Sequence, residues 1–81
     1  MLEAINQPID VLVAFMQKKV VPLSFFWQKR KYSIDSVNMV YQKTEGQELS
    51  YIFTVTSGGE YFKLLFNTFK NKWFILEANY E

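Results

Sequence analysis

The sequence predicts an all-β domain of about six antiparallel strands, and three observations lead to this prediction. Segments rich in Val, Ile, Phe, Tyr and Thr alternate with short groups typical of turns. Aromatic residues make up 19% of the 81-residue chain and charged residues 21%, a mixture that excludes a disordered tail and a coiled coil. No linker, repeat or low-complexity tract divides the chain. We therefore expect a strongly curled meander or a small SH3-like barrel, because both leave few open edges.

The expected strands cover residues 9–16, 20–27, 31–42, 48–56, 60–67 and 72–79. In the segment 48–56 the apolar residues of one face alternate with mainly polar residues, and that apolar face holds Leu49, Tyr51, Phe53 and Val55. The segment 60–67 alternates in the same way around Phe62, Leu64 and Phe66. Between these two strands Ser57-Gly58-Gly59 supplies residues that tolerate positive φ, as a tight hairpin requires. The inward face of the last segment stays open between Trp73 with Ile75, and Phe74 with Leu76 and Ala78.

A helix competes with the strand expected at residues 9–16. Pro8 suits the first turn of a helix, and Lys18 and Lys19 suit its negative end. Against this, β-branched residues at alternate positions favour a strand. Residues 1–7 are expected to form an N-terminal extension, either frayed or folded as a short helical turn, before a single β-domain of residues 8–81.

The segment 31–42 is long for a single strand, so we expect it to bend. Tyr32 and Ile34 share one face, and Val37 joins the next apolar set only if the register slips by one residue. A β-bulge near Asp35 and Ser36 would supply this slip and would bend the sheet towards closure.

The residue types that are missing exclude most enzyme chemistry. The chain has no Cys and no His, so disulfides, imidazole acid–base catalysis, the Ser-His-Asp triad and most zinc sites are absent. The carboxylates show no spacing that would bring two of them together for catalysis or for a metal ion. We therefore expect no enzyme, no cofactor and no metal site. Because no secretory leader or long apolar run is present, a cytoplasmic protein without membrane contact is expected.

Positive charge is concentrated between residues 17 and 43, which hold six basic residues against one acidic residue. Aromatic rings adjoin these cations, among them Phe25, Phe26 and Trp27. Cations that follow the backbone and rings that stack on bases suit single-stranded nucleic acid. The leading hypothesis is a non-enzymatic module that binds single-stranded nucleic acid weakly or assists a DNA-repair or polymerase system. Its candidate residues are Lys18, Lys19, Trp27, Lys29, Arg30, Lys31, Lys70 and Lys72.

An excess of bulky apolar side chains supports an alternative function. A domain of this size buries only about 60% of the surface that its unfolded chain exposes. Some members of a set of bulky residues should therefore reach the exterior; the set is Phe15, Phe25, Trp27, Tyr41, Tyr61, Leu65, Phe69 and Phe74. Because a contiguous exposed apolar patch usually marks a binding surface, the alternative is a protein-interaction or homodimerisation module. Whether Phe25 and Trp27 lie in the core or on the surface stays open at this point.

The stretch Pro22-Leu-Ser-Phe25-Phe-Trp27-Gln-Lys-Arg30-Lys-Tyr32-Ser-Ile34 resembles the core of a small, uncharacterised bacterial β-domain family, which reads Pro-x-x-Phe-x-Trp-x-Gly-Arg-x-Tyr-x-Val. The flanking motifs follow in the same order, and they are Ile9-Asp-Val11, Gly59-Glu-Tyr-Phe62-Lys-Leu64 and Trp73-Phe-Ile75. The resemblance covers roughly residues 8–76 and implies an all-β domain with no assigned activity or binding residue. Some family members are encoded beside error-prone polymerase and recombination genes, which associates the family with DNA.

One position departs from the motif of that family. Lys29 stands where the family has its turn glycine, so a hairpin that depends on positive φ is in question or has changed type. The resemblance is also compatible with structural roles for the motif, with Arg30 stacked on an aromatic ring and Tyr32 inside the barrel.

Overall fold

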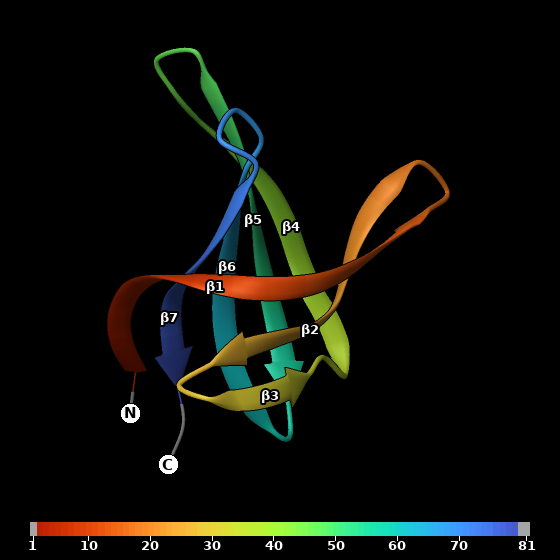
Figure 1. Cartoon of the computed structure of the whole chain (residues 1–81), viewed down its shortest axis with the longest axis vertical. Helices are drawn as coiled ribbons and strands as arrows, with labels where there is room; N and C mark the ends of the chain where they lie inside the picture. The colour runs from red at the N-terminus through yellow and green to blue at the C-terminus, as the bar shows by residue number, and fades with distance from the viewer. Residues whose placement is uncertain (1, 80–81) are drawn as a thin grey trace.

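The computed structural model describes residues 2–79, which form seven antiparallel strands in one sheet (Figure 1). The strands are β1 (Leu2–Met16), β2 (Lys19–Trp27), β3 (Arg30–Ser33), β4 (Ser36–Glu45), β5 (Glu48–Ser57), β6 (Glu60–Asn67) and β7 (Lys72–Asn79). Their order across the sheet is β3-β2-β1-β7-β6-β5-β4. The all-β fold is therefore confirmed, with seven strands in place of about six. Within residues 2–79 no helical segment has the length and apolar character that a bilayer crossing requires.

Strand β1 joins two parts of the sheet. Its first half pairs with β7, from Leu2 to Ile9, and its second half pairs with β2, from Asp10 onward. The helix considered for residues 9–16 and the helical or frayed extension considered for residues 1–7 are therefore wrong for the described residues. Pro8 is compatible with the strand because pairing with β2 begins only after it, so its missing N–H removes no bond on that side.

Strand β3 ends at Ser33 and β4 begins at Ser36, so two strands are present where a single bent strand was predicted. The Asp35 N–H donates to the Thr56 carbonyl (2.8 Å), and the Ser57 hydroxyl donates to the Ser33 carbonyl (2.6 Å). These two bonds join the end of β3 and the residue before β4 to β5. They therefore hold the two edge strands, β3 and β4, together at one corner of the sheet. Among the described strands β3 does not pair with β4, so the sheet curls but does not close into a barrel. The predicted bulge lies slightly further along, where Asn38 has no counterpart on β5.

The hydrophobic core lies inside this curl and is rich in aromatic rings. Its buried members are Phe25, Trp27, Phe53, Val55, Phe62, Leu64, Ile75 and Ala78. The alternation predicted for β5 and β6 is thus confirmed at its central positions. In β7, Ile75 and Ala78 both face the core, because Leu76 has no counterpart on β6 and reverses the alternation. Each of the two readings of this strand was therefore correct for part of it.

Two of the hairpin turns place ordinary side chains in the left-handed backbone conformation. Gln17 and Lys18 have φ of 51° and 63°, and Gln28 and Lys29 have φ of 52° and 63°. Lys29, for which a turn glycine was the expectation, thus has a positive φ, at a cost of about 1 kcal/mol. The turn at Gly58 also has positive φ, as the sequence predicted.

Candidate functional site

The structure distributes the predicted nucleic-acid-binding cations over three separate turns. Lys18 and Lys19 lie at the β1–β2 turn, the run 29–31 at the β2–β3 turn, and Lys70 and Lys72 at the β6–β7 turn. The first two turns are at opposite ends of β2 (Figure 1), whose nine residues span about 26 Å if straight. The largest group within one turn is therefore Lys29, Arg30 and Lys31, and the eight candidates form no continuous track.

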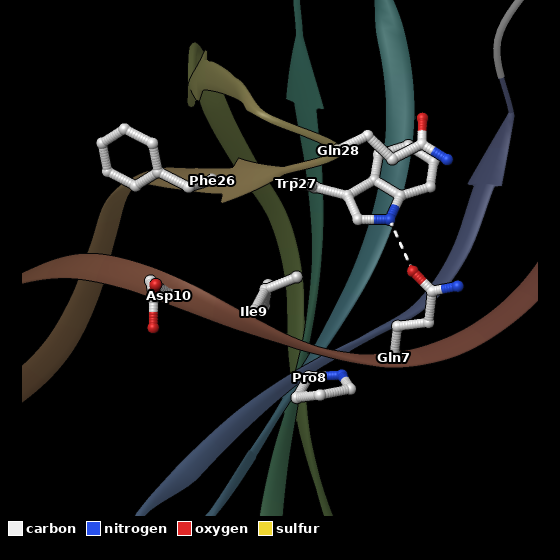
Figure 2. Close-up of a pocket in the computed structure, with 7 residues that line it drawn as sticks. All are labelled: Gln7, Pro8, Ile9, Asp10, Phe26, Trp27 and Gln28. Carbon is white, nitrogen blue, oxygen red and sulfur yellow. Dashed lines mark hydrogen bonds between the residues drawn. The ribbon is translucent and has the colours of Figure 1, made fainter.

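Trp27, the one aromatic candidate of the predicted site, belongs to the core. Its side chain is 5% exposed and lies edge-on to Phe62, with ring centroids 6.3 Å apart. The indole Nε1–H donates to the Gln7 side-chain carbonyl at 3.0 Å (Figure 2). Phe25 is fully buried and stacks on Tyr32 at 5.0 Å. Neither Trp27 nor Phe25 is thus positioned to stack on a base, which corrects the expectation for Trp27.

What remains of the basic and aromatic surface lies on the outer side of the β2–β3 hairpin. Phe26 is 48% exposed and stands directly opposite Lys31, which is also exposed. Arg30 lies over the Tyr32 ring, with its guanidinium carbon 5.2 Å from the ring centroid, as its position in the motif suggested. This leaves a small surface of one exposed ring and the neighbouring cations Lys29 and Lys31.

Two shallow hollows flank the middle of β1. The first, of about 300 Å³, lies between Gln7–Asp10 and Phe26–Gln28 (Figure 2). The second, of about 440 Å³, lies on the other side of β1 against Asn71–Trp73. Asp10 is the single carboxylate in either lining. Within the described residues no group of three acidic side chains is placed to hold a metal ion.

Several exposed apolar side chains lie on the hairpin of β1 and β2. They are exposed by 41% to 74%, and Phe15 is the most exposed of them. We call this surface the apolar arm and define it by Leu12, Val13, Phe15, Met16 and Leu23. Figure 1 shows the hairpin extending away from the curled sheet. Lys18 and Lys19 follow at its turn, so the arm has a basic tip.

The arm extends away from the sheet because the pairing of β1 with β7 ends before the arm begins. On the β7 side, β1 is paired only as far as Ile9, whereas its pairing with β2 continues to Met16. At the point of departure Leu23 has no counterpart on β1, which marks a β-bulge. Beyond this bulge the arm is a two-stranded ribbon, and such a ribbon cannot bury either of its faces alone.

The sequence did not predict the arm, although it places apolar residues on both faces of this segment. In a half-buried strand apolar and polar residues alternate, but Leu12, Val13, Phe15 and Met16 supply apolar groups to both faces. The same pattern occurs in β4, where Val37, Met39, Val40 and Tyr41 are all exposed. Of the eight bulky residues expected to include surface positions, Phe15, Tyr41 and Phe69 are the exposed ones.

Comparisons of the chain with protein-family models, with curated proteins and with solved structures give no significant match. The resemblance to the bacterial β-domain family therefore stays a prediction.

Proposed function

We propose that this chain is a non-enzymatic module that binds a protein partner through the apolar arm. The observation that carries the proposal is that five large apolar side chains are exposed together on one two-stranded hairpin. These side chains lie on both faces of the ribbon, and large apolar side chains that stay exposed close together often mark a binding surface. Burying a Leu, Met or Phe side chain releases about 1.5–3 kcal/mol, so a partner that covers the arm gains a substantial driving force.

The charge of the tip indicates the chemistry of the partner. Lys18 and Lys19 are exposed beside the arm. A complementary surface would therefore be an apolar groove bordered by carboxylates. Charges at the rim of an interface mainly set the association rate and its salt dependence, whereas the buried rings set the affinity. Phe15 should accordingly dominate the dissociation rate, and the two lysines should affect the association rate.

The chain offers a matched control for Phe15. Phe69, in the β6–β7 turn, is 73% exposed against 74% for Phe15, but lies outside the arm. Proteins retained from a cell extract by the wild type and by Phe69→Ser, and lost with Phe15→Ser, are partner candidates. With the purified partner, Phe15→Ser should raise the dissociation constant at least tenfold, because an aromatic ring that acts as the hot spot of an interface contributes about 2 kcal/mol or more. Equal effects of both substitutions, or none of either, would contradict the proposal.

A second candidate function is the binding of single-stranded nucleic acid at the β2–β3 turn. It is favoured by the exposed Phe26 ring directly opposite Lys31, with Lys29 in the same turn. Titration with single-stranded DNA at two salt concentrations tests it, because phosphate contacts release counterions and weaken as salt rises. Lys31→Ala and Phe26→Ala should each weaken binding at low salt. No binding at low salt, or an affinity that does not change with salt, removes this candidate.

A further inference from the structure

Strand β4 leaves one of its edges open. It pairs with β5 on one side, and no other described strand pairs with it on the other. In an antiparallel edge strand, alternate residues direct their N–H and C=O groups away from the sheet. All ten residues of β4 are exposed. An extended strand is therefore the kind of group that fits this edge.

Both faces of β4 carry uncovered apolar side chains. Val40 lies opposite the buried Phe53 and is nevertheless 50% exposed. On the other face Met39 is 58% and Tyr41 is 41% exposed. A strand added beside β4 would extend the sheet and cover apolar groups on both faces at once, which an occupant of one face would not.

The edge also lacks the features that usually prevent strand addition. Residues 36–45 contain no Pro and no Gly, and their single lysine, Lys43, is paired with Glu45 at 3.0 Å. The one irregularity is the bulge at Asn38, near the start of the strand. The opposite edge differs, because β3 has only four residues and two of them are Arg30 and Lys31. Short, charged edges resist pairing, whereas long uncharged ones accept it.

The sequence of the edge favours a second copy of this chain as the occupant. Residues 36–42 carry no charge, so an antiparallel partner of the same sequence brings no like charges together there. A two-fold axis through Val40 would set Val40 against its own equivalent. On the other face it would set Met39 against Tyr41 of the second copy, a favourable contact of a thioether with a ring. The two Lys43 side chains would lie on opposite sides of the axis.

We infer that β4 pairs with β4 of a second copy of this chain, antiparallel about a two-fold axis through Val40. Two seven-stranded sheets are then joined edge to edge, with the same residues contributed by both copies. This interface does not use the apolar arm, so it goes beyond the proposed function, and either proposal can fail without the other.

Sedimentation equilibrium of the full chain over a range of concentrations tests the inference. The wild type should show a concentration-dependent dimer. Val40→Lys and Val40→Glu should each raise the dissociation constant at least tenfold, because each places two like charges across the axis. An equimolar mixture of the two variants should restore dimers, since it places Lys opposite Glu. Circular dichroism of each variant checks that the exposed substitution leaves the fold intact.

Phe15→Ser is the matched control, because it removes the most exposed ring of the arm and leaves β4 unchanged. It should dimerise as the wild type does. The inference is overturned by a wild type that stays monomeric at about 1 mM. It is also overturned by a dimer that tolerates Val40→Lys, or by a mixture of the charged variants that stays monomeric. Pairing of β4 only with a strand of another protein would overturn it as well.

Discussion

The two ends of the β1–β2 hairpin differ sharply in burial although both carry aromatic and aliphatic side chains. At the base of the hairpin, where β2 leads into β3, Phe25 is fully buried. Towards the β1–β2 turn, Phe15 is 74% exposed. At the base β3 flanks β2, and Phe62 of β6 packs on Phe25 at 5.1 Å. No other described strand pairs with the arm. The presence of neighbouring strands and the face on which a ring lies, and not the residue type, thus decide which rings become core; Phe26 has the same neighbouring strands as Phe25 but is 48% exposed on the outer face.

The largest difference between the two ends should appear in stability. Phe25→Ala should lower the free energy of unfolding by about 3–5 kcal/mol, because it leaves a cavity in the core. Phe15→Ala should change it by less than about 0.5 kcal/mol, since the ring is already in water. Urea denaturation measures both, and Phe25→Leu serves if Phe25→Ala does not fold. A loss of unfolding free energy at Phe15 equal to that at Phe25 would contradict the different burial of the two rings.

The corner between the sheet edges should give the next largest effect. Ser57→Ala removes the buried hydroxyl that donates to the Ser33 carbonyl at 2.6 Å. The expected loss is about 1–2 kcal/mol, because the carbonyl loses its partner. Ser36→Ala is the control, since the Ser36 hydroxyl is exposed and its bond to Asn38 is local. Equal losses of unfolding free energy in urea denaturation would mean that the hydrogen bond of Ser57 to Ser33 does not stabilise the corner between the sheet edges.

The two turns with positive φ at Lys18 and Lys29 lie at opposite ends of β2 and should differ in their effect on stability. Lys29→Gly relieves a positive φ at the base of the sheet and should raise the free energy of unfolding by about 0.5–1 kcal/mol. Lys18→Gly makes the same change in the turn of the arm. It should raise the free energy of unfolding less, because the arm opens before the whole domain unfolds. Thermal unfolding of the two variants measures this order. A larger gain from Lys18→Gly would indicate that the arm unfolds together with the core.

The smallest effect should come from the ion pair of Lys63 and Glu77 on the outer face of β6 and β7. Burial alone lowers the pKa of Lys63, but the Glu77 carboxylate at 3.4 Å, with Tyr41 and Tyr61, outweighs it and the pKa is raised above 10.5. The stabilisation is complete below the unfolded-state pKa and is lost as the pH rises through the folded-state pKa.

Such a partly exposed pair contributes less than about 1 kcal/mol. The thermal midpoint of the wild type should therefore fall slightly more than that of Lys63→Met between about pH 9 and pH 11.5. The variant is the necessary control because the tyrosines titrate in the same range. Identical pH profiles would contradict the role of this pair.

The sequence predicted β5 and β6 correctly because both are paired on two sides and their central core residues recur at every second position. The first residues of β1 escaped prediction because their strand character depends on pairing with β7, and Asn6 interrupts it with a φ of 59°. The reversal of faces at Leu76 likewise depends on the partner strand. Register shifts of this kind depend on how two strands pair, so the sequence of one strand alone does not predict them.

The binding surface was predicted less well than the fold. Rings such as Trp27 suit a core and a base-stacking surface equally, so composition did not distinguish the two. Basic residues within one stretch of sequence were expected to lie together, but the two ends of a β-strand lie far apart. Residues 12–16 carry apolar side chains on both faces, but the same pattern occurs in the interior strand β7, so the sequence alone does not distinguish a strand that the chain covers from one that it leaves exposed.

Hydrogen exchange of individual amides tests the central claim most directly, namely that the apolar arm is a ribbon without cover in the free chain. At a protein concentration where the chain is monomeric, amides between Leu12 and Leu23 should exchange at least about a hundred times faster than those of Phe53 and Val55. Protection of the arm equal to that of β5 would contradict the account, because it would mean that the arm is packed against the rest of the domain.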